Sequence, residues 1–292
     1  MREFIFDQWG YQIEQEDSYS FFYENWYFRL EKTDYDEKHL QNLAAFCQSL
    51  SSQIPQHAEI VLNKHQHYIS RMGNDDLVLI SVPNIAPSWE LLMKLQTIPF
   101  GNQTYTLTEM QELWEEKARL YQEQVVPSLR KIIPDDTLEA YLIYARYLLE
   151  NAIQYLAEIR LDHSDVIPHL VLAHKRLSHW DAYSILNPLN MVLESRTRDL
   201  AELFKFGYVS VSSAVRVLKE YQVDTMEAEL FFARVLFPTP FLDLCEEAFA
   251  SHELRKKAIL EEGKKLQNKM KDIVVLHQML ISTFSIRRIS WL

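Results

Sequence analysis

The stretch VLAHKRLSHWDA, residues 171–182, places a histidine and two cations at the end of a short apolar run. His174 ends the run, and Lys175 and Arg176 follow it directly. Catalytic residues are disproportionately found on loops that a rigid scaffold positions. The stretch is therefore either a catalytic loop or a loop that has lost its catalytic residues, and the chain on either side of it decides between the two.

The first third of the chain has the pattern of a small antiparallel sheet that carries one helix. WYFRLEK (26–32) is rich in aromatic residues and predicts a strand, while residues 34–50 repeat apolar side chains at helical spacing. Two extended runs follow, at 58–72 and 76–82. Gly-Asn-Asp at 73–75 lies between them and is typical of a tight turn.

Prolines mark the end of this part. Pro83, Asn84 and Pro87 interrupt both the strand and the helix patterns, because proline restricts its own backbone and that of the residue before it. We expect a β-rich N-terminal lobe at residues 1–83 and a helical C-terminal lobe at residues 84–292. The predicted fold class is α+β.

The second part of the chain is mostly helical. Residues 108–133 are amphipathic, with a kink expected at Pro127. Asp135 and Asp136 then open a helix over residues 137–160, whose wide apolar face predicts a central, buried helix.

Further helix signals follow towards the end of the chain. Thr197 begins one helix, and Gly207 stops it. Asp224 and Glu227 form a capping pair that opens another. Residues 253–281 predict a long, charged helix or helix pair whose charges form a solvated face.

Composition excludes several classes of function. The 292 residues carry a net charge of −11 and a pI near 5.4, which argues against binding of nucleic acid. Cys47 and Cys245 lie far apart, so we expect two buried thiols rather than a disulfide or a zinc site. We expect no signal peptide and no membrane span, and hence synthesis and folding in a cytoplasm.

The order of these parts is that of a kinase-like phosphotransferase: a small sheet with one helix, a proline-marked hinge, and a helical lobe with a loop after its central helix. In that chemistry an Asp two residues after the loop histidine accepts the proton, and an Asn five residues further binds metal. Here Arg176 follows His174 at the first position and Asp181 stands at the second. Arginine stays protonated in proteins and cannot act as the base. Asp181 either binds metal or caps a turn.

The remaining elements of such a site are also altered. The segment before the next helix offers only Glu194 where an Asp should hold Mg²⁺. None of the five glycines forms a phosphate-covering GxGxxG loop. Arg29 and Lys32 are the candidates for a phosphate-binding cation, and the alternative is that both are surface cations.

Two histidine pairs have weaker claims to a function. His65 and His67 share one face of a predicted strand, a spacing that suits a transition metal, but no third ligand is evident nearby and a solvated strand face is the expectation. His179 and Trp180 either stack on a ligand or pack under the loop, and packing is the expectation.

The two cations of the opening stretch have an alternative role. Lys175 and Arg176 together suit an anionic ligand such as a phosphate or a carboxylate. Pairing with nearby acidic side chains is the competing explanation.

Four blocks carry a resemblance to a known family: ENAIQYL (150–156), AHKRLSHWD (173–181), SRTRDLAELF (195–204) and FFARVLFPTPF (231–241). In this order and spacing the chain resembles the YutH family of spore coat-associated proteins from endospore-forming bacilli. That family is similar to the CotS-like group and to aminoglycoside phosphotransferases. The resemblance implies a two-lobe kinase-like fold.

The resemblance also implies roles for individual residues. His174 corresponds to the catalytic-loop histidine, and Arg176 occupies the position of the base. Glu194 lies near the former metal site. Asp199 is implied to be structural, capping its helix and tying it to the loop.

Two functions follow from these observations. The first is a non-catalytic kinase-like protein, a scaffold or interaction module of the spore coat, with coat proteins as partners and no cofactor. It would be made in the mother cell and located in the coat. The second is an active small-molecule phosphotransferase that uses ATP and Mg²⁺ with Asp181 and Glu194 as metal ligands.

Overall fold

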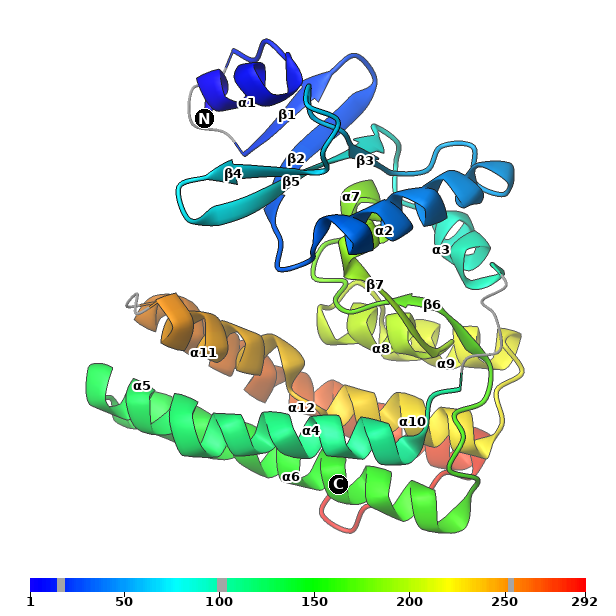
Figure 1. Cartoon of the computed structure of the whole chain (residues 1–292). Helices are drawn as coiled ribbons and strands as arrows, with labels where there is room; N and C mark the ends of the chain where they lie inside the picture. Colours follow the sequence, from blue (N-terminus) through cyan, green and yellow to red (C-terminus); the bar gives the residue numbers. More distant parts are fainter. Residues whose placement is uncertain (15–18, 99–103, 252–254) are drawn as a thin grey trace. The chain divides into compact units, whose positions relative to one another are not determined.

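The computed structural model describes most of the chain (Figure 1): residues 1–14, 19–98, 104–251 and 255–292. The chain forms two compact units. Unit 1 consists of Met1–Pro99 with His174–Val192, and unit 2 of Phe100–Ala173 with Leu193–Leu292. The lobe boundary expected between residues 83 and 84 stays a prediction. The compact units are divided elsewhere, because unit 1 extends to Pro99 and takes in a second segment.

Unit 1 contains a five-stranded antiparallel sheet. Its strands are β1 (Ser20–Tyr23), β2 (Trp26–Lys32), β3 (Glu59–Val61), β4 (Ile69–Met72) and β5 (Asp75–Pro83). The long strand β5 lies in the middle. It pairs with β2 along one edge, and with β4 and then β3 along the other. This central position explains why the side chains from Leu77 to Pro83 are all buried.

The sequence expectation for residues 58–72 was wrong. The run is divided into two strands by a loop at residues 62–68. Buried Asn63 organises the loop: its Oδ1 accepts from the backbone N–H groups of His65 (2.9 Å) and His67 (3.0 Å). Asparagine competes in this way with strand pairing. The two histidines are therefore exposed loop residues and do not share a strand face.

Short helices complete unit 1: α1 (Arg2–Trp9), α2 (Glu37–Ser49), α3 (Trp89–Gln96) and α7 (Ala182–Leu186), with 3₁₀ turns at Leu50–Ser52 and Pro188–Asn190. The predicted strand at 26–32 and the predicted helix within 34–50 are confirmed. Helix α2 begins where Asp36 accepts from the His39 N–H at 2.7 Å. Its buried face packs against Ile60 and Val78 of the sheet.

Unit 2 is a helical assembly (Figure 1). Its helices are α4 (Leu107–Leu120), a π-helical turn (Tyr121–Val125), α5 (Val126–Ile132), α6 (Asp136–Asp162), α8 (Arg198–Lys205), α9 (Val211–Glu220), α10 (Thr225–Leu236), α11 (Thr239–Ser251) and α12 (Lys256–Phe284). Helix α6 packs against α4, α10 and α12. Every residue of α10 from Met226 to Leu236 is buried, so the core of the unit lies around this helix.

The predicted helix boundaries in unit 2 are largely confirmed. Asp135 caps α6 by accepting from the Leu138 N–H at 3.0 Å. Asp224 and Glu227 form the capping box of α10. Ahead of Pro127, where a kink is predicted, the helix changes to a π turn in which the Val126 N–H reaches five residues back.

Two short strands, β6 (Leu170–His174) and β7 (Met191–Ser195), form a separate two-stranded sheet. The division between the units crosses both strands. Both cysteines are buried, as expected, and burial raises the pKa of the Cys47 thiol to about 12. In the described ranges, no helix combines the length and the apolar character that a membrane crossing requires.

Candidate functional site

His174 lies at the end of β6 and is completely buried. Its Nε2–H donates to the carbonyl oxygen of Ile185 in α7, at 2.7 Å. A carbonyl oxygen can only accept, so this contact places a proton on Nε2. The imidazole thereby fixes the short helix α7 to the strand that precedes it.

Asn190 holds the segment that follows His174. Its Oδ1 accepts from the Arg176 N–H at 3.1 Å, and its Nδ2 donates to the carbonyl oxygens of Arg176 (2.6 Å) and Ser184 (3.1 Å). No motif in the sequence predicted a role for this residue. The only signal in the sequence is the turn composition of Asn-Pro-Leu-Asn at 187–190.

Arg176 has contacts within its own loop. Its guanidinium Nη1 donates to the carbonyl oxygen of Lys175 at 2.6 Å. Because a guanidinium keeps its proton, the side chain in the expected position of the base supplies positive charge and hydrogen-bond donors. It offers no acceptor for a substrate proton.

Asp181 is the N-cap of α7. Its Oδ1 accepts from the Ser184 N–H at 2.6 Å. Of the two roles open to this residue, the structure shows the capping role. One carboxylate oxygen is therefore occupied in ending the loop and starting the helix.

Lys175 is half-buried beside Tyr35. Its Nζ donates to the Tyr35 hydroxyl (3.1 Å) and to the Leu189 carbonyl oxygen (3.0 Å), and lies 5.6 Å from the centre of the Tyr35 ring. These three contacts are with uncharged groups. Binding of an anion and pairing with local acidic side chains both stay predictions.

His179 and Trp180 differ from each other in environment. His179 is exposed, so the expectation that it packs under the loop was wrong. Trp180 is half-buried, and its ring centre lies 5.7 Å from that of Trp89. The indole therefore packs as expected, against α3 of the same unit.

The two cations of β2 have different partners. Lys32 forms an exposed ion pair with Asp75 at 2.7 Å. Arg29 pairs with Glu31 at 3.1 Å, and its guanidinium lies 5.2 Å from the centre of the Tyr183 ring. The Tyr183 hydroxyl also donates to Glu31, at 2.7 Å. Arg29 is thus part of a contact between β2 and α7 within unit 1.

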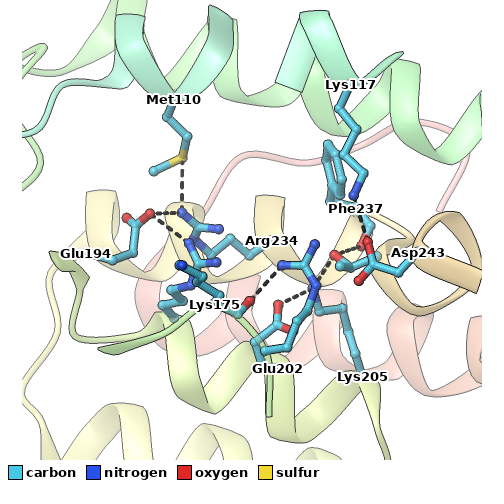
Figure 2. Close-up of polar contacts among 12 residues, drawn as sticks. Met110, Lys117, Lys175, Glu194, Glu202, Lys205, Arg234, Phe237 and Asp243 are labelled. Carbon is cyan, nitrogen blue, oxygen red and sulfur yellow. Dashed lines mark hydrogen bonds and ion pairs between the residues drawn. The ribbon is translucent and has the colours of Figure 1, made fainter. Parts of the chain in front are cut away.

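Glu194 is the second carboxylate that the sequence assigned to a metal site. It is only 1% exposed, lies on β7 and contacts two arginines of unit 2, of which Figure 2 labels Arg234. Arg198 Nη1 contacts Oε2 at 3.0 Å, and Arg234 Nη2 contacts the same oxygen. One buried negative charge is therefore matched by two positive charges.

Arg234 is the residue of this cluster that was not predicted from the sequence. It comes from the buried helix α10, 6% exposed, and also contacts Met110 Sδ at 3.6 Å and lies 5.6 Å from the centre of the Trp114 ring (Figure 2). A lone arginine within the apolar run FFARVLF was a signal for it, because a buried arginine needs an acidic partner.

Asp199 is completely buried in the first turn of α8. The residue at the N-cap position is Thr197, so the expectation that Asp199 caps the helix was wrong. An acidic residue in the first turn still interacts favourably with the helix dipole.

These side chains do not fit a Mg²⁺ site. Magnesium requires oxygen ligands in a near-octahedral arrangement. The carboxylate of Glu194 is held by two guanidinium groups, and that of Asp181 by a backbone N–H. Over the part of the chain that the structure describes, three or more His, Cys, Asp or Glu residues nowhere come together in a way that could hold a metal ion.

The electrostatic effect of Glu194 extends to a neighbouring tyrosine. Burial, and next the negative charge of Glu194, raise the pKa of Tyr105 to about 12. Tyr105 therefore stays protonated throughout the physiological range.

Solved structures share the fold. A spectinomycin phosphotransferase in complex with ADP and spectinomycin is 13% identical, with a TM-score of 0.56, over 94% of this chain and 95% of that one. An aminoglycoside 2′-phosphotransferase bound to GDP has a TM-score of 0.46 and 12% identity over 86% of each chain. The first of these likenesses shows that the chain has the two-lobe kinase-like fold of the spectinomycin phosphotransferase.

Sequence comparison identifies the family. The endospore coat-associated protein YutH of Bacillus subtilis (strain 168) is 27% identical over 128 residues, which span 39% of this chain and 38% of that protein. The family described as "Spore coat putative kinase YutH" matches residues 2–280. The chain therefore belongs to the YutH spore coat family.

Proposed function

We propose that the chain is a non-catalytic, kinase-like protein that acts as a scaffold or interaction module in the spore coat. The observation that carries this proposal is the buried ion cluster of Glu194, Arg198 and Arg234. A carboxylate that binds Mg²⁺ must exchange its partners for the metal. Here the exchange would take the Glu194 carboxylate away from two buried or nearly buried guanidinium groups that it contacts directly.

The segment after His174 supports the same proposal. Arg176 occupies the position of the base, and Asp181 caps a helix. Loss of general-base catalysis typically lowers a rate by about 10² to 10⁴. Phosphoryl transfer depends still more on correctly placed charges. A free carboxylate at this position would be negative, whereas Glu194 together with its two arginines carries a net positive charge.

The spore coat location is proposed from the family and from the relative. The relative's name describes an endospore coat-associated protein, and the family description also refers to the spore coat. The partners would then be other coat proteins, and synthesis would take place in the mother cell.

The experiment is a calorimetric titration of the full chain with Mg²⁺ and then with ATP and Mg²⁺. We expect no saturable heat from either titration. Two variants are run in parallel: Arg176→Asp restores a carboxylate at the position of the base, and the double variant Arg198→Gln/Arg234→Met frees Glu194 from its guanidinium partners. Circular dichroism checks that each variant is folded.

A Mg²⁺-dependent heat that appears only in the double variant would support the ion cluster as the cause of the missing activity. Saturable Mg²⁺-dependent binding by the unchanged chain, lost in Glu194→Gln and accompanied by phosphoryl transfer, would instead establish the alternative, an active phosphotransferase.

A further inference from the structure

A cavity lies between α6 and the segment that follows α12. It has a volume of about 280 Å³, close to the lower end of small-molecule pockets. One wall comes from α6, including Gln154, Tyr155 and Glu158, and the other from residues 288–291. All of these residues belong to unit 2.

The segment that forms the second wall is tied to α6. Trp291 Nε1 donates to Asn151 Oδ1 at 2.8 Å, so the indole is fixed at the edge of the cavity. The side chain of Trp291 is nevertheless 46% exposed. Because its N–H is already used, what Trp291 offers to a ligand is the face of its ring.

Tyr155 supplies a buried group without a partner. The residue is only 3% exposed, and its hydroxyl forms no hydrogen bond with any residue that the structure describes. Leaving such a group unsatisfied typically costs about 1–3 kcal/mol. Burial, followed by the charge of Glu229, raises the pKa of Tyr155, so the hydroxyl keeps its proton and is available as a donor.

Arg288 supplies a positive charge. It is exposed and makes no ion pair or side-chain hydrogen bond with other described residues, whereas its neighbour Arg287 contacts both Glu158 and Asp162. Glu158 is the acidic residue of the cavity wall, and its contact with Arg287 at 2.6 Å matches its charge. A negative ligand would therefore meet Arg288 without facing an unpaired carboxylate.

We propose that this cavity binds a small aromatic carboxylate, that is, a carboxylate group attached to a planar ring. The carboxylate would pair with Arg288 and accept from the Tyr155 hydroxyl, while the ring of the ligand would stack on Trp291. A carboxylate accepts several hydrogen bonds at once, and a guanidinium matches its geometry. The site is separate from the Glu194 cluster and does not depend on the proposed function.

Benzoate is the probe for the test. The full chain is titrated with benzoate, followed by tryptophan fluorescence and calorimetry, and compared with cyclohexanecarboxylate and inorganic phosphate. We expect saturable binding of benzoate with a change in the Trp291 signal, at least tenfold weaker binding of cyclohexanecarboxylate, and no saturation with phosphate. Arg288→Gln should weaken benzoate binding at least tenfold. Trp291→Phe identifies the source of the fluorescence change.

Tyr155→Phe gives an independent readout. Because the hydroxyl has no partner, its removal should leave the Tm of the free protein unchanged or raise it, while benzoate binding weakens several-fold. A clear fall in Tm would show that the hydroxyl already has a structural partner and would overturn the proposal. It would also be overturned by the absence of saturation with benzoate, by equal binding in Arg288→Gln, or by tighter binding of phosphate.

Discussion

Asn190 holds three backbone groups of the segment after His174, a role that belongs to a single side chain. Each of these groups would lose its partner if the amide were removed, and the segment contains both Arg176 and the N-terminus of α7. The conformation of the loop is therefore set by a residue that comes after it in the chain.

Replacement of Asn190 by alanine should lower the free energy of unfolding by about 2–3 kcal/mol, because three hydrogen bonds are lost at a half-buried position. Urea denaturation measures the change. Asn190→Asp is the matched control, because it keeps the acceptor for the Arg176 N–H and loses both donated hydrogen bonds. Its loss of stability should be smaller than that of Asn190→Ala, or larger if the new carboxylate has no cationic partner. An effect below about 0.5 kcal/mol for Asn190→Ala would contradict the role.

For single residues, the sequence predicts which positions belong to the candidate site better than it predicts which side chains they contact. His174, Arg176 and Asp181 can be found from their spacing alone. The pairing of Glu194 with Arg234 cannot, because the two residues are 40 positions apart and meet only when α10 packs beside β7. Exposure is equally hidden: His179 was expected to be packed and is open to solvent.

At the scale of helices and strands, the contact between α12 and α6 depends on one glycine. Gly263 is buried, and a Cβ atom at this position would lie 2.3 Å from Cδ2 and 3.0 Å from Cβ of Tyr141. The near end of the tyrosine side chain cannot move away without a change of its rotamer or of the backbone.

Gly263→Ala should therefore destabilise the protein by about 1–3 kcal/mol, although alanine is the better helix former by about 1 kcal/mol. Thermal denaturation by circular dichroism checks the result. In a Tyr141→Ala background the ring atoms are gone and only the contact with the Cβ atom of residue 141, at 3.0 Å, remains, so the same substitution should be much less destabilising. If Gly263→Ala stabilised both backgrounds equally, the close approach of the two helices would be disproved.

Elements with a strong period were predicted, and those fixed by tertiary contacts were not. The amphipathic and capped helices α6 and α10 match their predicted positions. Helix α1 was missed because it is short and its burial depends on aromatic partners from the sheet. At residues 58–72 the prediction gave too much regular structure: one extended run was expected, but the loop that Asn63 organises divides it into two strands.

At the scale of the whole molecule, His277 makes stability depend on pH. It is 2% exposed on α12, stacks on Phe232 with ring centres 4.8 Å apart, and its Nε2 lies 3.1 Å from the Arg287 carbonyl oxygen. Burial lowers the pKa of His277 below its ordinary value of 6.5, although the hydrogen bond to Arg287 opposes the shift. The unfolded chain thus takes up a proton at a higher pH than the folded chain does.

The free energy of unfolding should therefore be largest above pH 6.5 and fall as the pH decreases below it, by at most about 1.4 kcal/mol per pH unit from this group. Denaturation curves between pH 5 and 8 measure this. The slope below pH 6.5 should be smaller in His277→Gln and unchanged in His65→Gln, which alters an exposed histidine. An unchanged slope in His277→Gln would assign the dependence to other groups.

The fold class could be inferred from the order of the elements, but the composition of the compact units could not. No composition change marks His174–Val192 as part of unit 1. The assignment rests on long-range contacts such as Lys175 with Tyr35 and Tyr183 with Glu31, which connect residues 140 and 152 positions apart.

This discontinuity has a consequence for how the chain is made. A ribosome releases residues 1–99 long before residues 174–192, and the intervening residues 100–173 belong to unit 2. The strands of the sheet all lie within residues 20–83, but unit 1 is complete only when its second segment follows, after α4 and α6 have emerged. Neither unit is complete during synthesis before part of the other has been made. Vectorial folding, in which one domain is completed before the next is synthesised, therefore does not apply to this chain.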